Sequence, residues 1–427
     1  MRNILIRYTD IERWKDTGRR VLVYGRRKVG KSFFIKNFTE WDEFFHVKRD
    51  GTLVDLKSMR EISYEYLKDY LLKESHRKTV VDEFHRLPED FLDFLHIFAD
   101  KLNLTIITST LWLSRKILGK SSPILGLFEE FKMNIVDERD VIMFLEKRLS
   151  GKELIDTAVY IREPWIIPML KTSIYREIPR ILVEQKNTIE RLIGEIFREE
   201  ERELGKVYIA IMESIASGKV KSSEVSSYLY SRKIMGKDDP SIIQSYITTL
   251  CNIGILEKLE IHNKKYRHYY HISPIIDLYF YLDSKYGFSE IDIPLIEVEK
   301  VFYEKLPLHV EQFFRNLLSK ITGMRKSKII EKDYDIDIVL KSFQKIKVVA
   351  EVKWKKFISR REIYRIEENL NKFRQARKIL IVPDSKMLEE KPEQIEIWDV
   401  DKIIKIVAEN LRLNRDRPKY LGGIRLY

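Results

Sequence analysis

Residues 21–32 read Val21-Leu22-Val23-Tyr24-Gly25-Arg26-Arg27-Lys28-Val29-Gly30-Lys31-Ser32, and this stretch decides the fold. Its first four residues are apolar and partly β-branched, as expected of a strand buried on both faces. The next eight match the pattern G-x-x-x-x-G-K-S, and the residues from Phe33 to Phe38 continue with helical spacing. A strand, a glycine-punctuated loop and a helix in this order predict a loop that cradles phosphate groups.

The chemistry of such a loop follows from its backbone. Successive N–H groups and the N-terminus of the following helix form a concave site for anions. Glycine at positions 25 and 30 lets the backbone turn and approach phosphate without a Cβ in the way. Lys31 would reach the β- and γ-phosphates, and the Ser32 hydroxyl would bind Mg²⁺. We therefore expect residues 25–33, Phe33 included, to contact ATP or ADP.

A second stretch, Thr79-Val80-Val81-Asp82-Glu83, follows the phosphate loop and its helix along the chain. An apolar strand that ends in two acids suits a nucleotide hydrolase, because Asp82 would hold the Mg²⁺ hydration shell and Glu83 would polarise the attacking water. By itself the pattern is common, and its place after the loop gives it weight. A third apolar strand, over 104–110, ends in hydroxyls. Ser109 there would sense the γ-phosphate, or it would cap the next helix.

Composition sets the broad class of the protein. At 427 residues, 44% hydrophobic and 34% charged, the chain is expected to form about two to four globular domains. The single cysteine, Cys251, excludes an intramolecular disulfide, and no apolar run reaches the ~18 residues that a membrane span needs. We expect a cytoplasmic protein without membrane contact. A net charge of +12 suits contact with nucleic acid, but it also occurs in proteins that merely stay soluble.

Hydrophobic periodicity and turn signals divide the chain into six segments. In chain order we expect a phosphate-loop core over 1–135, a helical lid over 136–204, a winged helix over 205–283, a linker over 284–300, a second α/β domain over 301–410, and a basic tail over 411–427. The winged helix would combine three helices with a hairpin of 255–261 and 266–272. Its third helix and hairpin tip would contact DNA, or the module would serve packing or contacts with a second copy of the chain.

A second group of charged residues lies in the C-terminal segment. A hairpin centred near Gln344 would place Asp337 opposite Glu351, with Lys353 on the same face. Asp337 and Glu351 would bind Mg²⁺ or Mn²⁺ that activates water, and Lys353 would stabilise charge on a phosphate ester. Glu311, from a preceding helix, would complete the site. The alternative is a charged ladder on a solvated face.

With these residues in view, the chain resembles the archaeal ATPase family of the AAA+/STAND group, which often carries a C-terminal domain similar to PD-(D/E)xK nucleases. The resemblance rests on residues 23–32, on 81–88, on the strand end at 107–110, on Pro179 with Arg180, and on Asp337 with 351–353. It implies an α/β P-loop NTPase core with a helical lid, a winged-helix domain and an α/β restriction-endonuclease-like domain. The arginine that follows the family's sensor strand is absent, since Leu127 follows Gly126.

Two functions are compatible with the sequence. The first is an ATPase that couples its nucleotide state to DNA binding, and to metal-dependent DNA cleavage at Asp337, Glu351 and Lys353. The second is a slow nucleotide-dependent switch for signalling or assembly, in which an inactive nuclease-like domain is a docking surface. Salt-dependent DNA binding separates the two, because neutralising phosphates gives a steep salt slope.

Overall fold

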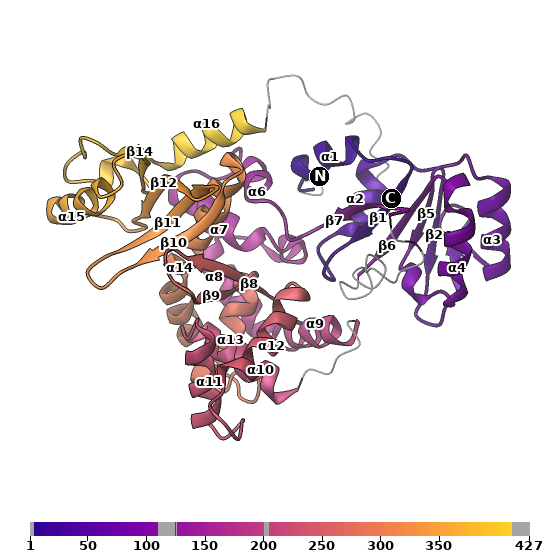
Figure 1. Cartoon of the computed structure of the whole chain (residues 1–427), viewed down its shortest axis with the longest axis horizontal. Coiled ribbons are helices and arrows are strands. Elements are labelled where there is room, and N and C mark those ends of the chain that lie inside the picture. Colours follow the sequence, from indigo (N-terminus) through magenta and orange to yellow (C-terminus); the bar gives the residue numbers. More distant parts are fainter. Residues whose placement is uncertain (1–3, 110–123, 125, 200–204, 412–427) are drawn as a thin grey trace.

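The computed structural model describes residues 4–109, 124, 126–199 and 205–411. Figure 1 shows an N-terminal α/β unit at one end of the molecule, drawn in indigo and purple, and a C-terminal sheet in orange and yellow at the other. Helices from the middle of the chain lie between the two sheets and, in this view, below the C-terminal one. The basic tail over 411–427 lies outside the described residues, apart from Leu411.

The N-terminal sheet has, within the described residues, seven strands in the order β4-β3-β2-β5-β6-β1-β7. Strands β2, β5, β6, β1 and β7 are parallel, and β3 and β4 add an antiparallel edge. The bounds are β1 (Arg20–Tyr24), β2 (Glu43–Val47), β3 (Leu53–Asp55), β4 (Arg60–Ile62), β5 (Thr79–Asp82), β6 (Leu104–Thr108) and β7 (Glu129–Lys132). The strands expected at 21–24 and 79–83 are β1 and β5, which lie in one parallel sheet, and the short strands β3, β4 and β7 are additions.

Helices cover both faces of this sheet. They are α1 (Tyr8–Lys15), α2 (Lys31–Phe38), α3 (Tyr64–Lys73) and α4 (Asp90–Phe98). Alternation along β1 explains the two layers, since Val21 and Val23 pack with Phe34 of α2 on one face. Leu22 packs with Phe91 of α4 on the other. Parallel strands buried on both faces place all their carboxyl ends at one edge, where ligands of such sheets bind.

The middle of the chain is helical. Its first part contains α6 (Glu138–Leu145), α7 (Gly151–Ile161), α8 (Ile174–Glu184) and α9 (Lys186–Glu199), which lie within the segment predicted as a lid. Next come α10 (Lys206–Ala216), α11 (Ser222–Ser231) and α12 (Pro240–Asn252), then the antiparallel strands β8 (Leu256–Ile261) and β9 (Arg267–His271). Three helices and a hairpin therefore follow each other in the predicted order.

The C-terminal sheet has seven described strands in the order β14-β13-β12-β11-β10-β8-β9. Its remaining elements are α13 (Pro274–Tyr286), α14 (Leu295–Thr322), β10 (Arg325–Ile330), β11 (Asp335–Ser342), β12 (Lys345–Val352), α15 (Arg360–Asn371), β13 (Arg377–Ile381), β14 (Glu396–Trp398) and α16 (Val400–Asn410). Strand β8 pairs with β10 in parallel, so the hairpin of β8 and β9 belongs to the C-terminal sheet.

The expected division of the chain differs from the structure in two places. The stretch 284–300 is not a free linker, because α13 runs to Tyr286 and α14 begins at Leu295. The C-terminal sheet also joins the two segments that this linker was expected to separate, because it contains β8 and β9 as well as β10 to β14. The hairpin tip also lies against β10 rather than free, since the His262 N–H donates to the Lys328 carbonyl and Lys264 pairs with Glu331 at 2.8 Å. In an isolated hairpin β8 would be an edge strand with unpaired backbone groups, whereas here β10 pairs with it on that side.

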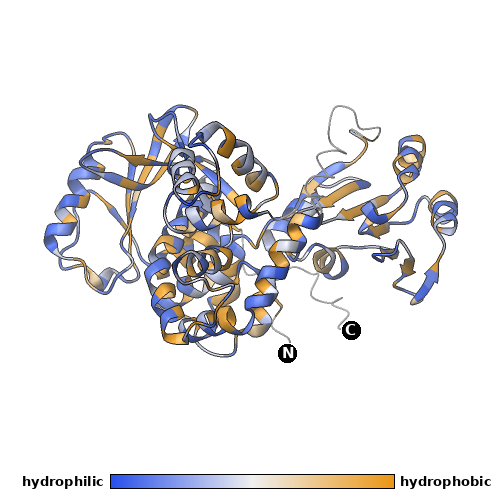
Figure 2. Cartoon of the chain, turned by 90° about the horizontal axis from the view of Figure 1, so that it is seen from below, coloured by the Kyte–Doolittle hydropathy of each residue, from blue (hydrophilic) through white to orange (hydrophobic). Residues whose placement is uncertain are grey.

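Hydrophobic residues lie mainly where the packing of helices against the two sheets buries them. Figure 2 shows them gathered in the strands of the N-terminal sheet, while the helices alternate hydrophobic and hydrophilic positions. No helix among the described residues combines the length and the apolarity that crossing a bilayer demands.

Candidate functional site

The loop between β1 and α2 has a backbone that depends on glycine. Gly25 has φ +155°, and a Cβ at this position would lie 2.0 Å from the Met133 carbonyl oxygen. Gly30, the residue directly before α2, has φ +94° and lies in the left-handed region that favours glycine. Lys28 also has a positive φ, 65°. The loop thus turns tightly and packs its backbone against the segment after β7.

Gly25→Ala is expected to destabilise the protein by about 3 kcal/mol or more, because the new Cβ meets a backbone oxygen that cannot move away alone. The melting temperature should fall by several degrees, as measured by circular dichroism. Gly194→Ala in α9 is the matched control, since nothing lies within 4 Å of a Cβ there. Equal melting temperatures for the two variants would contradict the close approach at Gly25.

Lys31 is held inside this loop. Its side chain is buried, with 6% of the residue exposed. The ammonium donates to the carbonyl oxygens of Gly25 at 2.8 Å and Arg26 at 3.2 Å. These bonds satisfy a charge that would otherwise be costly to bury, and they keep it where phosphate groups would lie in such a loop.

Asp82 and Glu83 follow β5 at the same edge of the sheet. The Asp82 carboxylate contacts His46 Nδ1 through Oδ2 at 3.2 Å, while Oδ1 is buried without a hydrogen-bond partner among the described residues. Glu83 has φ +60°, in the left-handed region that non-glycine residues rarely adopt. The structure thus places both predicted acids at the carboxyl edge, one with an unsatisfied oxygen.

Ser109 lies directly after β6, which separates β5 from β1. Its hydroxyl donates to Glu83 Oε2 at 2.9 Å, so its contact in this structure is with the acid. Burial and the neighbouring charge of Asp82 raise the pKa of Glu83, although Lys31 and Arg86 oppose the shift. A carboxylate with a raised pKa, oriented by a hydroxyl, is suited to act as a general base.

The two arginines of the loop pair with acids from the lid segment. Arg26 Nη2 lies 2.5 Å from Glu163 Oε1, with both side chains buried. Arg27 Nε lies 2.9 Å from Glu195 Oε2 of α9. Sequence reasoning did not identify either acid, since Glu163 is 137 residues away from Arg26. Three predicted loop residues remain. Lys28 and Phe33 are exposed, and Val29 is buried.

Magnesium is the ion that this loop implies, and the donors here fit it. Mg²⁺ prefers hard oxygen ligands and is bound through one or two carboxylates together with water and phosphate oxygens. Ser32 is partly exposed at the start of α2, and Asp82 offers an unpaired oxygen. No group of three His, Cys, Asp or Glu side chains in the described ranges could hold a metal by itself, so phosphate oxygens would have to complete the coordination.

The C-terminal hairpin brings its predicted residues together. Asp337 on β11 and Glu351 on β12 lie directly beside the cross-strand pair of Ile338 and Ala350. The Val352 N–H donates to Asp337 Oδ2 at 3.0 Å, and Lys353 Nζ donates to Glu351 Oε2 at 2.9 Å. Asp337 and Glu351 are buried, so the alternative of a solvated ladder does not describe them.

A cation that sequence reasoning missed completes this carboxylate cluster. Lys328 Nζ of β10 lies 3.0 Å from Glu311 Oε1 and 3.6 Å from Asp337 Oδ1. Arg315 of α14 also pairs with Glu311 and donates to the Asp337 carbonyl at 3.0 Å. We define the carboxylate cluster as three acids and three cations, namely Glu311, Asp337, Glu351, Arg315, Lys328 and Lys353. The exposed Asp335 lies at its edge, 3.8 Å from Lys328.

This charge balance fits a divalent metal ion poorly. Burial and the charge of Asp337 raise the pKa of Glu351 to about 8. A proton on this carboxyl would compete with Mg²⁺ or Mn²⁺ for the same oxygens. Burial would also raise the pKa of Asp337, but Lys328 and Lys353 outweigh it and lower that pKa. Ammonium groups already supply the positive charge that a metal would bring.

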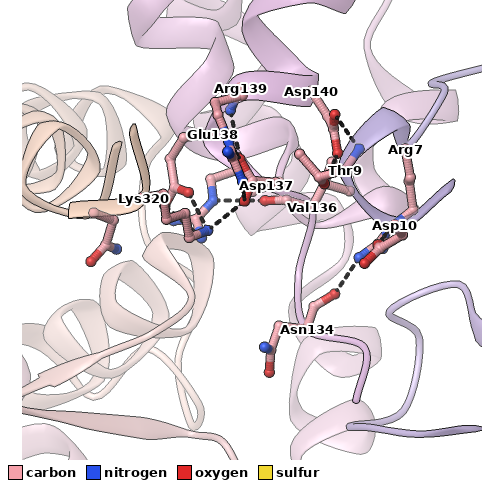
Figure 3. Close-up of polar contacts among 12 residues, drawn as sticks. Arg7, Thr9, Asp10, Asn134, Val136, Asp137, Glu138, Arg139, Asp140 and Lys320 are labelled. Atoms are coloured by element: carbon pink, nitrogen blue, oxygen red, sulfur yellow. Dashed lines mark hydrogen bonds and ion pairs between the residues drawn. The ribbon is translucent and has the colours of Figure 1, made fainter. Parts of the chain in front are cut away.

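A cavity of about 770 Å³ lies where the lid segment begins, between α1 and the C-terminal ends of α14 and α16. Figure 3 shows the contacts that line it. Lys320 of α14 pairs with Asp137 at 3.0 Å and with Glu138 at 2.5 Å. The Thr9 hydroxyl of α1 donates to Asp140 at 2.5 Å. These pairs fasten α6 both to the N-terminal unit and to the C-terminal helices.

Comparisons with known proteins give weak likenesses. No protein-family model and no curated protein matches the chain. Among solved structures, the chain is similar to the Walker-type ATPase PABY2304 of Pyrococcus abyssi, at 16% identity and a TM-score of 0.47, over 65% of this chain and 96% of that one.

Two proteins of Aeropyrum pernix are also similar. One is the ORC2 protein in ADPNP-ADP complexes, at 10% identity and a TM-score of 0.35, over 67% of this chain and 87% of that one. The other is the ORC1 protein in complex with DNA, at 13% identity and a TM-score of 0.27, over 67% and 95%. At these values the function has to be argued from the chain's own residues.

Proposed function

We propose that the chain binds ATP in the loop between β1 and α2 and hydrolyses it there. The observation that carries the proposal is the convergence at one sheet edge of a buried lysine inside a glycine-dependent loop with two acids. The lysine is Lys31, and the acids are Asp82 and Glu83. Asp82 has a buried oxygen without a hydrogen-bond partner among the described residues, and the pKa of Glu83 is raised.

Each residue has a distinct task in this reaction. The loop amides and Lys31 bind the phosphates and stabilise the charge on the transferring phosphoryl group. Glu83 orients the attacking water and accepts its proton, and Ser109 fixes the Glu83 carboxyl through the hydrogen bond at 2.9 Å. Ser32 and Asp82 would hold Mg²⁺, which neutralises phosphate charge.

Phosphate release from ATP tests this proposal directly. The purified chain with Mg²⁺ should release phosphate with saturable dependence on ATP, and chelation of the metal should abolish the release. No turnover above the buffer rate in the presence of Mg²⁺ and ATP would contradict hydrolysis.

We also propose that the C-terminal module contacts nucleic acid through the surface that follows the carboxylate cluster. Between residues 355 and 365 the sequence holds one acid, Glu362, and five basic residues, namely Lys355, Lys356, Arg360, Arg361 and Arg365. Phe357 is 57% exposed and Tyr364 is 51% exposed. Exposed aromatic rings among cations favour single-stranded nucleic acid, whose bases stack and whose phosphates pair with Lys and Arg. We call this surface the basic–aromatic segment.

Replacing both rings of the basic–aromatic segment, Phe357→Ala with Tyr364→Ala, is expected to weaken binding of single-stranded DNA by about tenfold or more, because each stacked base is worth about 1–3 kcal/mol. Fluorescence anisotropy at several salt concentrations measures this. Arg361→Ala with Arg365→Ala should instead flatten the salt dependence. Tyr66→Ala, at a ring 52% exposed on α3, is the control and should bind as wild type does.

A slow nucleotide-dependent switch is the second candidate. The charge balance of the carboxylate cluster favours it, since a cluster neutralised by lysines and an arginine suits a docking module better than a metal-dependent nuclease. This candidate predicts tight nucleotide binding, very slow turnover, and no salt-dependent binding of DNA. The anisotropy series on the basic–aromatic segment therefore discriminates between the two.

A further inference from the structure

Helix α7 connects the nucleotide loop with the strand end that carries Glu351 and Lys353. Figure 1 shows α7 between the N-terminal and C-terminal sheets. Glu163 follows the last residue of α7, Ile161, by two positions, and Asp156 lies in the middle of the helix. Both acids are buried. Helix α7 and the turn directly after it thus present a buried carboxylate to each of two distant sites.

At the loop end, the contact is a single hydrogen-bonded ion pair. Arg26 Nη2 and Glu163 Oε1 are 2.5 Å apart, with 5% and 1% of the two side chains exposed. Arg26 Nη1 and Glu163 Oε2 are buried without a hydrogen-bond partner among the described residues. The guanidinium therefore keeps a buried donor unused, although a guanidinium can bind an oxyanion through two parallel bonds.

At the other end, α7 holds the residue next to Lys353. Trp354 Nε1 donates to Asp156 Oδ1 at 2.6 Å, and the Tyr175 hydroxyl donates to Asp156 Oδ2 at 2.6 Å. Trp354 is buried, with 8% of the residue exposed. A displacement of α7 would therefore shift Trp354 and the end of β12.

A second contact joins α7 to the carboxylate cluster. The Tyr160 hydroxyl lies 3.0 Å from His309 Nδ1, and both side chains are buried. His309 lies on α14 two residues before Glu311, which belongs to the cluster. Helix α7 is thus connected to the carboxylate cluster by two contacts, one with the residue after β12 and one with α14.

We propose that Glu163 is a positioning residue of the nucleotide site, which competes with the phosphates of ATP for Arg26, and that α7 relays the outcome to Trp354. This inference rests on the proposed binding of ATP. A ligand shifts a conformational equilibrium only through contacts that differ between the two states. Arg26 supplies that difference, because it pairs with Glu163 in one state and with phosphate in the other. Glu163, left as an unpaired buried carboxylate, would then have to move.

Tryptophan fluorescence with a non-hydrolysable ATP analogue and Mg²⁺ tests the relay. The chain has six tryptophans, so Trp354→Phe isolates the signal of interest. We expect the analogue to change the fluorescence of the wild type, and Trp354→Phe to remove most of that change. Trp398→Phe, at another buried tryptophan, is the matched control and should retain it.

Glu163→Gln tests the competition. Removing the carboxylate charge should tighten analogue binding by about tenfold, which corresponds to about 1.4 kcal/mol, and should abolish the Trp354 signal. Glu184→Gln, at an exposed acid that ends α8, should change neither quantity. Arg26→Gln is the second variant: in its presence, Glu163→Gln should no longer alter affinity, since the two residues act through one contact.

The outcomes separate the inference from the proposed function. Failure of the wild type to bind the analogue would overturn the proposed ATP site. Binding without a Trp354 signal would overturn the relay and leave the ATP site intact. Unchanged or weaker binding by Glu163→Gln would overturn the competition for Arg26, as would an equal effect of Glu163→Gln with and without Arg26.

Discussion

Lys31→Ala is expected to lower ATP turnover by at least about 100-fold, the largest loss that a single substitution in the loop should produce. The ammonium of Lys31 is buried and held by two loop carbonyls at 2.8 and 3.2 Å, within the loop where we propose that the phosphates bind. A hydrogen bond to a charged group is worth about 1.5–3 kcal/mol, and the charge on the phosphates grows toward the transition state. Steady-state phosphate release measures the effect.

Lys36→Ala is the matched control for this substitution. Lys36 lies on the same helix, α2, but is exposed and stacks over Phe44 at 4.7 Å. Its loss should leave turnover within about twofold of wild type, because surface substitutions away from a site have small effects. Equal turnover in Lys31→Ala and wild type, with both chains folded by circular dichroism, would overturn the assignment of the loop.

Glu83→Gln is expected to reduce turnover by about 10²–10⁴-fold, the usual contribution of a general base, while nucleotide binding persists. The amide keeps the shape and the contact with Ser109 but cannot accept a proton from water. Turnover at saturating ATP and the dissociation constant of a fluorescent nucleotide separate the two effects. Glu89→Gln, at an exposed acid before α4, is the control and should preserve both.

The pH profile of the wild type adds a second readout of Glu83. Burial and Asp82 raise the pKa of Glu83 from its ordinary value of 4.5. A base works in its ionised form, so the activity should be lost with falling pH at a higher pH than an exposed glutamate would give. Retention of half the wild-type turnover by Glu83→Gln would show that another group activates the water.

The strand, loop and helix over residues 21–38 could be predicted because their information is local. Residues 21–38 contain the strand, the two glycines and the start of α2, so no distant part of the chain is needed to recognise them. The acids at the end of β5 and the hydroxyls at the end of β6 follow from the same logic, because parallel strands align their carboxyl ends. The hairpin register that brings Asp337 to Glu351 was equally local, since a short turn fixes it.

The partners of these residues could not be predicted, because they come from distant segments. Glu163 reaches Arg26 across 137 residues, and Lys328 reaches the carboxylate cluster only because β10 pairs with β11. Such contacts depend on tertiary packing, and hydrophobic periodicity predicts only secondary structure. The same limit hid the pairing of β8 with β10, which turned a predicted independent hairpin into part of a larger sheet.

Calorimetric titration of Glu83→Gln with ATP and Mg²⁺ tests the central claim most directly, since this variant should bind ATP without consuming it. We expect one ATP per chain, and no measurable binding when Lys31→Ala is added to the same variant. Absence of binding in Glu83→Gln, or equal affinity with and without Lys31, would contradict an ATP site in the loop between β1 and α2.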